Sequence, residues 1–294
     1  MNTTLAYKPI IYHIPLSNLD KYYEKCPLFK PRLSTATTSL TTTCCLNNEN
    51  SQESPSGFSL LKSDVSCKSG SLWSTLAFYI FSLHIPLSFG GVSAVASVFH
   101  QSVVDPQTQA LSILIIESVE FIGFLLLLRF SHNQVELLDC FKPKKLLKER
   151  SWILASILGF GFIVLTLFLT SILADQLIGP KDVNNPVLRD MLSGGEISAT
   201  ACILLYCVVT PILEESVYRG FLLTSLSSTM TWKQSVIISS LIFSASHFSG
   251  ENFLQLFVIG IVLGCSYCWS GNLSSSIAIH SLYNALILYV TYVS

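Results

Sequence analysis

Two long stretches of the chain hold no charged side chain, one between Lys68 and Asp105 and one from Asn252 to the last residue. A helix needs about 20 mostly apolar residues to cross a bilayer. Lipid offers no hydrogen-bond partner to an open backbone, so a crossing segment must satisfy its own amides and carbonyls. The two stretches therefore predict an all-α fold, namely a polytopic bundle of transmembrane helices.

The composition agrees with a membrane protein and argues against several functional classes. Charged residues make up 12% of the chain and hydrophobic residues 50%, whereas soluble domains carry about 25% charged residues. A soluble enzyme is therefore not expected. The formal net charge of -1 argues against a general binder of polyanions, so we expect no nucleic-acid partner. The expected partners are membrane lipid and a membrane-associated protein or peptide substrate, and the oligomeric state stays open.

The apolar segments predict about seven spans in a helical membrane domain that covers residues 72–294. The fifth and sixth are short for a full crossing, so we expect them to tilt, to thin the bilayer or to extend further. The expected spans are 72–99, 110–130, 152–174, 197–226, 235–248, 253–269 and 273–293.

Residues 1–68 differ from the membrane domain, and we expect them to form a disordered leader. The segment is polar and interrupted by proline, Ser and Thr fill most of positions 34–43, and bases outnumber acids in residues 1–45. Such a composition does not repay the entropy of ordering and is typical of an organellar transit peptide. Because Arg is scarce, a chloroplast membrane is the expected location, with the endoplasmic reticulum as the alternative. A disordered cytosolic tail is the other interpretation.

The fourth expected span carries three ionisable residues, each of which costs about 2.5–3.5 kcal/mol at the centre of a bilayer. Glu215 and Arg219 are four residues apart with the acid first, the favourable order for a pair on one helix face. Glu214 is turned about 100° away from Glu215 and has no local countercharge. Pro211 lacks an amide hydrogen, which predicts a kink and a carbonyl of Cys207 without its helical partner. The ion pair alone is also consistent with a packing role.

Two later spans each carry a histidine with a second notable residue four positions away. Phe243 precedes His247, and His280 precedes Asn284. Two histidines, an unpaired glutamate and an amide on three apolar helices need a shared polar pocket, because lipid satisfies none of them. Such a pocket can activate water by general base catalysis and stabilise an oxyanion. The same groups can hold Zn²⁺ as a His₂Glu site with an open water position, and the spacing does not choose between the two.

The three motifs together resemble one protein family. E-E-x-x-x-R, F-x-x-x-H and H-x-x-x-N, in this order on three apolar segments, are similar to the motifs of the CPBP (ABI) family of intramembrane proteases. This family includes the Ras-converting CAAX endopeptidase and bacterial self-immunity proteins. The resemblance covers the motif core at 195–294 and, with the leader, suggests a plastid-type plant member. It implies a membrane endopeptidase that is either a metalloenzyme or glutamate-dependent.

The resemblance also implies roles for the residues of the first two motifs. Glu214 would activate the attacking water, with His247 beside that water. Glu215 and Arg219 would support the site or serve its structure. These roles are consistent with a paired Glu215 and an unpaired Glu214.

For the third motif, the resemblance implies that His280 and Asn284 act as ligands or as donors to an oxyanion. If zinc is bound, Glu214, His247 and His280 would hold it, and the alternative is a mechanism without metal. If the leader targets a plastid, prenylated CAAX substrates are not expected, because the leader would remove the enzyme from that pathway.

The expected spans place the two histidines at different depths. His247 lies at the end of the fifth expected span, and His280 lies about 10 Å into the seventh at 1.5 Å per residue. Across a core of about 30 Å, this predicts a gap of roughly 15 Å between them. Tilt, a thinned core or a deeper fifth helix must close this gap in a common site.

Two other functional classes use parts of the same pattern. One is a non-catalytic membrane scaffold or binding protein that retains the pocket. The other is a small-molecule transporter, which should show inverted repeats or broken helix pairs in both halves, and neither is evident in the sequence. The unpaired Glu214 favours the enzyme, because a scaffold would tolerate its loss.

Two further features of the apolar segments have open roles. Glu117 and Glu120 either form a proton or substrate path or are interior carboxylates paired with a polar neighbour such as Arg129. Cys265 and Cys268 form a C-x-x-C pair, which we interpret as packing because this motif alone is a weak redox or metal signal. We expect most of the nine cysteines to be free thiols.

Overall fold

The computed structural model describes seven ranges of the chain, and every long element in them is a helix. No residue in these ranges forms a strand, which confirms the all-α fold class. Residues 1–57 and 62–68 of the expected leader lie outside the described residues, so its disorder and its targeting role stay predictions. The described ranges are 58–61, 69–100, 104–131, 140–141, 150–177, 185–250 and 252–293.

The described residues form α-helices and three π-helical segments, which are labelled η. The N-terminal part contains α1 (Ser69–Tyr79), η2 (Ile80–His84), α2 (Ile85–Val98), α3 (Pro106–Phe130) and α4 (Trp152–Leu177). The C-terminal part contains α5 (Pro186–Ser193), α6 (Glu196–Leu204), η4 (Leu205–Val209), α7 (Thr210–Glu215), η5 (Ser216–Leu223), α8 (Thr224–Ser227), α9 (Trp232–Ser246), α10 (Phe253–Ser270) and α11 (Ser274–Val293).

Among the described residues, six helical stretches are long and apolar enough to cross a membrane. The expected span at 235–248 corresponds to α9, which has 15 residues. Such a helix rises only about 22 Å, less than the roughly 30 Å of a hydrocarbon core. The chain is therefore an integral membrane protein in which α9 is too short to cross. The six stretches are Ser71–Val98, Pro106–Phe130, Trp152–Thr170, Glu196–Ser227, Phe253–Ser270 and Ser274–Val293.

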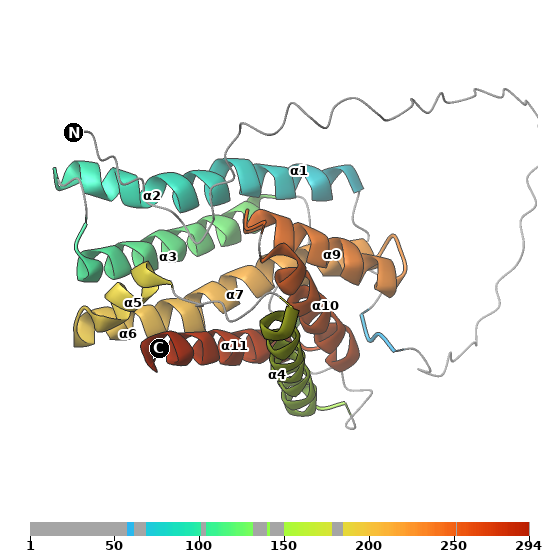
Figure 1. The fold of residues 1–294 in the computed structure, drawn as a ribbon. Coiled ribbons are helices and arrows are strands. Elements are labelled where there is room, and N and C mark those ends of the chain that lie inside the picture. The colour runs from blue at the N-terminus through green and yellow to red at the C-terminus, as the bar shows by residue number, and fades with distance from the viewer. Residues whose placement is uncertain are drawn as a thin grey trace, which may run out of the picture. The chain divides into compact units, whose positions relative to one another are not determined.

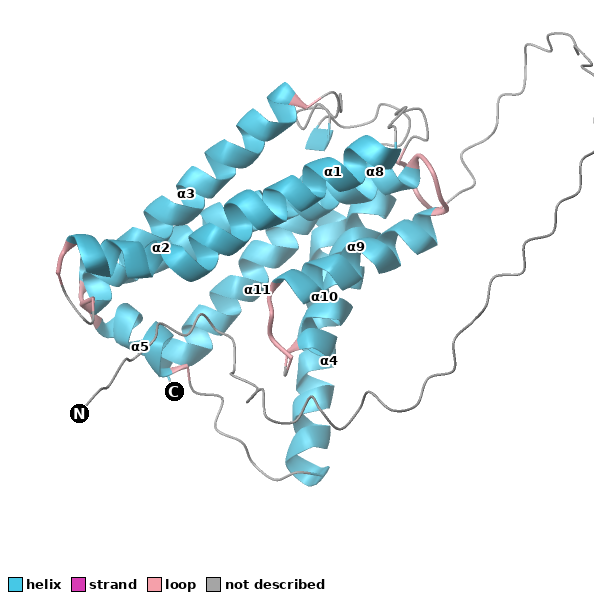
Figure 2. Ribbon diagram, turned by 90° about the horizontal axis from the view of Figure 1, so that it is seen from above, coloured by secondary structure: helices cyan, strands magenta, loops and turns pink. Residues whose placement is uncertain are grey.

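The span that runs from α6 to α8 lies inside the helical bundle. It packs against α3 on one side and against α11 on the other. Helices α1 and α2 follow one another along α3 (Figures 1 and 2). Helix α9 packs along α10, and α4 packs on α10 and α11 (Figure 1). Both expected glutamates of the site therefore lie on a helix that is enclosed by its neighbours.

Helices α9 and α10 approach each other closely at two glycines. A Cβ atom on Gly260 would lie 2.9 Å from the Cβ of Ser240, and one on Gly264 would lie 3.1 Å from Val236. Small residues allow helix backbones to come together in membranes. The carbonyl of Gly260 faces the central span and accepts a hydrogen bond from Arg219.

Four residues at the end of the expected leader pack on the membrane domain. The ring of Phe58 stacks on Trp232 with the centroids 4.5 Å apart. The backbone amide of Leu60 donates to the carbonyl of Cys268 at 2.8 Å. The described part 58–61 is thus attached to the ends of α9 and α10.

Candidate active site

The central span changes its helical register on both sides of the two glutamates. Helix α7 ends at Glu215, and the π-helical segment η5 that follows is buried at every residue. The π-helical segment η4 precedes α7 and ends at Val209. π-helical turns are rare and frequently occur at functional sites. Such turns therefore bracket Glu214 and Glu215.

Glu215 and Arg219 form the ion pair that their spacing predicts. Arg219 Nη1 donates to Glu215 Oε1 at 2.8 Å, and both side chains are fully buried. Arg219 Nη2 donates to the carbonyl of Gly260 at 3.2 Å, and the guanidinium lies 4.4 Å from the ring centroid of Phe243. The pair therefore connects the central span to α9 and α10.

His280 on α11 bonds to the same carboxylate. Its Nδ1 lies 3.0 Å from Glu215 Oε1. An ionised carboxylate only accepts hydrogen bonds, so Nδ1 carries the hydrogen of this bond. The other ring nitrogen, Nε2, faces Glu214 Oε2 at 3.7 Å. Glu215 thus fixes the orientation of His280 towards its neighbour.

His247 is oriented in a similar way at the end of α9. Its Nδ1 lies 2.7 Å from the carbonyl oxygen of Phe243, which can only accept, so Nδ1 donates. Its Nε2 faces Glu214 Oε1 at 3.6 Å. The ring of Phe243 meets both imidazoles edge to face, at 4.7 Å from His247 and 6.2 Å from His280.

Glu214 therefore lies between two imidazoles without a direct hydrogen bond to either. Distances of 3.6 and 3.7 Å are too long for a direct bond, and none of the described residues donates one to this carboxylate. Its Oε2 is buried without a hydrogen-bond partner, as is Oε2 of Glu215. Neutral imidazoles with Nδ1–H present lone pairs at Nε2, so the Glu214 site is lined by acceptors. A water molecule, which donates twice, fits such a site chemically.

The expected depth gap between the two histidines is wrong. Both Nε2 atoms lie within 4 Å of one carboxylate, so no gap of roughly 15 Å exists. The expected gap followed from treating 235–248 as a crossing span, whereas α9 ends one residue before His247, and His247 faces Glu214.

The chain around Pro211 follows a π-helical register, with hydrogen bonds five residues back, and not the expected α-helical register of four. The amide of Thr210 donates to the carbonyl of Leu205, five residues back, so the chain enters α7 from a π-helical turn. In that register the hydrogen that proline lacks would have served Tyr206 rather than Cys207.

The Asn284 amide on α11 takes the place of that missing hydrogen. Its Nδ2 donates to the carbonyl of Tyr206 at 2.8 Å. In the described part of the chain it makes no hydrogen bond to Glu214. The structure thus brings Glu214, His247 and His280 together and places Asn284 on the backbone nearby. The expected role of Asn284 as a ligand or an oxyanion donor stays a prediction.

The predicted zinc ligands have suitable chemistry, because two imidazoles and a carboxylate make up a common zinc donor set. Within the described ranges, however, no group of three or more His, Cys, Asp or Glu side chains is arranged so that it could hold a metal ion. Zinc binding by Glu214, His247 and His280 stays a prediction.

The structure also reveals a second polar cluster, in which Glu117 and Glu120 bond to residues that the sequence analysis did not connect with them. Glu120 Oε1 accepts a hydrogen bond from Tyr79 Oη at 2.5 Å and bonds His84 Nδ1 at 2.9 Å. Glu117 accepts from the hydroxyl of Thr210. Both glutamates are thus interior carboxylates with polar neighbours, as one interpretation held, but the partners of Glu120 are not Arg129. The sequence signal for this cluster was His84, a polar residue in the first expected span, but its partner Glu120 lies in another helix.

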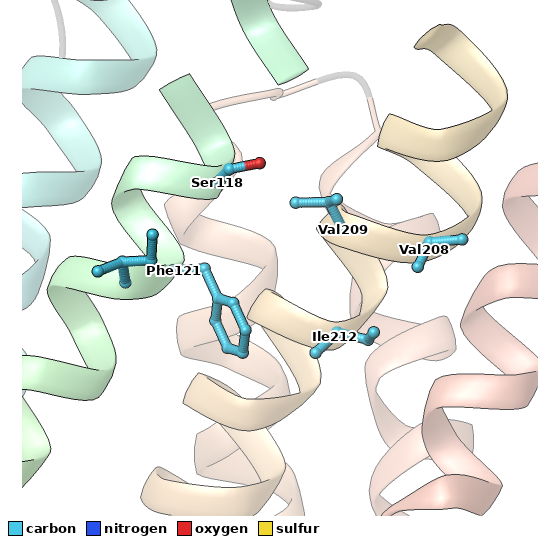
Figure 3. Close-up of a pocket in the computed structure, with 6 residues that line it drawn as sticks. Ser118, Phe121, Val208, Val209 and Ile212 are labelled. Carbon is cyan, nitrogen blue, oxygen red and sulfur yellow. The ribbon is translucent and has the colours of Figure 1, made fainter. Parts of the chain in front are cut away.

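An apolar pocket of about 200 Å³ lies between α3 and the segment that leads into α7 (Figure 3). None of the expected site residues lines it. Its lining residues are Ser118, Phe121, Ile122, Val208, Val209 and Ile212.

Comparison with known families covers the C-terminal part of the chain. Residues 196–286 match the model of the Rce1-like family, described as type II CAAX prenyl endopeptidase Rce1-like. The match confirms the resemblance to CAAX-type membrane proteases over this range, which contains all six expected site residues. It does not include α1, α2 or α3. No curated protein and no solved structure matches the chain.

Proposed function

We propose that this chain, whose residues 196–286 match CAAX prenyl endopeptidases, is an intramembrane endopeptidase with Glu214 as its general base. The observation that carries the proposal is the position of that carboxylate. Its two oxygens face the Nε2 atoms of His247 and His280 at 3.6 and 3.7 Å, and no described residue donates to it. A carboxylate among acceptors needs a donor, and water is the donor that hydrolysis consumes.

The reaction follows from these neighbours. Glu214 takes a proton from water while the water oxygen forms a bond to the carbonyl carbon of the substrate peptide. The former carbonyl oxygen becomes an oxyanion, which needs a hydrogen-bond donor. When the tetrahedral intermediate collapses, the C–N bond breaks and Glu214 returns the proton to the leaving amine.

His280 is the best placed donor to the oxyanion. It becomes a donor when Glu214 passes the proton of the water to Nε2 of His280, 3.7 Å from Glu214 Oε2. Glu215 on the Nδ1 side stabilises the protonated ring until the proton returns through Glu214 to the leaving amine. Arg219 holds Glu215 in place. His247 orients the water from the other side of Glu214. For Asn284 we propose a positioning role, because its amide is bonded to the backbone ahead of α7.

A zinc enzyme is the second form of the proposal. Zinc held by Glu214, His247 and His280 would lower the pKa of its bound water. A strong zinc chelator separates the two forms. Cleavage by the purified protein that survives the chelator would support the form without metal. Activity that is lost with the chelator and restored by Zn²⁺ would support the zinc form.

The test of the proposed function compares wild type with Glu214→Gln in membranes. Gln keeps the size of the side chain and removes the base. New N-termini of membrane proteins, identified by mass spectrometry, should appear with wild type and be absent with Glu214→Gln. Glu196→Gln, at an exposed position at the start of α6, is the matched control and should behave as wild type.

A membrane scaffold is the second candidate, and the contact of Asn284 with the Tyr206 carbonyl favours it because that contact serves packing. A scaffold predicts identical N-termini with wild type and Glu214→Gln. A farnesylated peptide that ends in a CAAX sequence gives a direct assay of the purified protein in vesicles, because the matched family is named for such substrates and an assay in vitro does not depend on which substrates share the compartment of the protein.

For the location we propose a chloroplast membrane, with the endoplasmic reticulum as the alternative. The support is the Ser- and Thr-rich, acid-poor composition of residues 1–68. A fluorescent reporter fused to residues 1–70 should enter plastids. A reporter that stays in the cytosol would contradict the plastid location and would leave the protease proposal intact.

A further inference from the structure

The polar cluster on the first span reaches the helix that carries His247. Nδ1 of His84 bonds to Glu120, and its Nε2 lies 3.4 Å from the carbonyl oxygen of Ser246, the residue before His247. Glu120 is almost fully buried, with 2% of its side chain exposed. The contact joins η2 and α3, which lie outside the family match, to the end of α9.

The π-helical turn η2 explains how this cluster forms. Tyr79 and His84 are five residues apart, which in an α-helix would point them roughly 140° away from each other. A π turn closes its hydrogen bond after five residues, and the amide of Ile85 indeed donates to the carbonyl of Ile80. The turn therefore stacks the two rings, with centroids 5.8 Å apart, and lets both bond the same oxygen of Glu120.

Both ring nitrogens of His84 face acceptors, a carboxylate and a carbonyl. A ring that satisfies both contacts carries a hydrogen on each nitrogen and is a cation paired with Glu120. The end of a helix carries a partial negative charge and carbonyls without intrahelical partners. His84 thus supplies both the hydrogen bond and the charge that the end of α9 needs.

The neighbouring carbonyls of α9 have local partners. The Phe243 carbonyl accepts from His247 Nδ1 and from the Ser246 hydroxyl, at 2.7 and 2.8 Å. The Ala245 carbonyl accepts from the amide of Phe248 at 3.0 Å. Two other helical segments contribute to the end of α9, because His84 of η2 contacts the Ser246 carbonyl and Tyr218 of η5 donates to the Ser246 hydroxyl at 2.6 Å.

A second contact holds the residue after His247. Phe248 has a backbone φ of 49°, which is strained for a bulky side chain. Such strain persists only where the surroundings hold it. The ring of Phe248 meets Phe89 of α2 edge to face at 5.3 Å. The first span thus contacts the chain on both sides of His247.

We propose that His84, held by Glu120 and Tyr79, is a positioning residue that fixes the end of α9 and so places His247 opposite Glu214. The catalytic consequence rests on the proposed function, whereas the structural consequence does not. The first span is in this sense part of the active site, although the family match begins far beyond it.

Two substitutions of His84 test the contacts of its two ring nitrogens one at a time. Gln places its amide where Nε2 of histidine lies, so His84→Gln keeps a donor to Ser246. Asn places its amide where Nδ1 lies, so His84→Asn keeps only the bond to Glu120. With a farnesylated CAAX peptide and full-length protein in vesicles, we expect His84→Asn to lower kcat by about 10- to 100-fold with little change in KM. His84→Gln should retain most of the activity, and His100→Asn, at an exposed position after α2, should equal wild type.

A second measurement does not depend on cleavage. Diethyl pyrocarbonate modifies imidazoles, and 29% of the His247 side chain is exposed. Mass spectrometry should show that His247 is modified at least about threefold faster in His84→Asn, because the end of α9 opens more often. Tyr79→Phe, which keeps the ring and loses the hydroxyl, should give a smaller increase. It also provides a mild variant if His84→Asn accumulates poorly.

Equal kcat and equal modification rates in His84→Gln and His84→Asn would overturn the proposal. So would an unchanged modification rate of His247 in both His84→Asn and Tyr79→Phe. If Glu214→Gln cleaves normally, the proposed function fails, but the modification rates still decide the role of His84.

Discussion

Glu214 and Glu215 are adjacent in the chain, yet their carboxylates have opposite surroundings. Glu215 is fully buried and accepts hydrogen bonds from Arg219 and His280 at 2.8 and 3.0 Å. The side chain of Glu214 is 16% exposed and accepts no hydrogen bond from the described residues. Because a helix turns successive side chains by about 100°, one short motif supplies an anchored carboxylate and an available one. The anchored one orients His280, and the available one can bind water.

The strongest test of this difference is Glu214→Ala. We expect cleavage of the CAAX peptide to fall by about 10²- to 10⁴-fold, the usual contribution of a general base. The protein should still accumulate in the membrane, because the substitution breaks no hydrogen bond. Peptide cleavage and immunoblots measure the two effects. Poor accumulation of Glu214→Ala would show that both carboxylates belong to one structural unit.

Arg219→Ala should have the opposite outcome and lower the abundance of the protein. The substitution leaves Glu215 charged and buried without its main partner, which costs about 3–5 kcal/mol out of a typical stability of about 5–15 kcal/mol. Immunoblots and thermal unfolding in detergent measure the loss. The double variant Arg219→Gln with Glu215→Gln removes both charges and should accumulate better than Arg219→Ala. Equal depletion of the two would argue against the ion pair as the cause.

Gly260→Ala tests whether the anchored carboxylate depends on the close contact of α9 and α10. The new Cβ would lie 2.9 Å from the Cβ of Ser240, and overpacking of this kind costs about 1–3 kcal/mol. A Cβ on Gly161 would meet nothing within 4 Å, so Gly161→Ala is the matched control. We expect a lower midpoint of thermal unfolding for Gly260→Ala alone. Similar midpoints for both variants would contradict the tight contact.

Asn284→Ala should lower stability by about 1 kcal/mol, the net value of one hydrogen bond. In a Pro211→Ala background the loss should be smaller, because the backbone regains an amide hydrogen near Tyr206. Thermal unfolding of the four proteins gives the coupling between the two positions. Additive losses would show that the Asn284 amide does not act by replacing the hydrogen bond that Pro211 cannot donate to Tyr206. Another role, such as a bond to the oxyanion, would then explain its effect.

Asp105 offers an exposed carboxylate for comparison with the two in the bundle. It caps α3, and hydrogen bonds from the Thr108 side chain and amide lower the pKa of Asp105 below its usual value. Its stabilisation is therefore complete above the ordinary aspartate pKa of about 3.9 and fades as the pH falls through the lowered value. The difference in unfolding midpoint between wild type and Asp105→Ala should be small and should vanish in acid. If the midpoints of wild type and Asp105→Ala still differ in acid, the capping effect of Asp105 does not depend on its negative charge.

Much of the fold could be predicted from the sequence, because hydropathy alone marks the long spans. Helix α9 could not be distinguished from a span in this way. From Ser235 onwards its apolar residues are interrupted only by serines, and its true limits, Trp232–Ser246, follow from the turns at its ends. The wrong depth of His247 came from treating this segment as a full crossing and not from its length, because 235–248 is about as long as α9.

The candidate site was predictable where the contacts are local. The pair of Glu215 and Arg219 needs only a helical spacing of four. The bond of His84 to Glu120 could not be predicted from local spacing, because it joins two helices. It also depends on a π-helical turn that no residue pattern in the sequence indicates. The same holds for Asn284, whose partner carbonyl is set by the register ahead of Pro211.

The short α9 also has a consequence for which bonds the site can reach. The helix begins with Trp232 and Lys233, side chains that favour the membrane interface. If α9 stands along the bilayer normal, its rise of about 22 Å from that interface leaves His247 about 8 Å below the opposite face of a core of about 30 Å. An extended peptide advances about 3.3 Å per residue, so under the proposed function the site would reach a bond some two to three residues inside that face. The length of α9 would then select substrates by how deep their bonds lie in the bilayer.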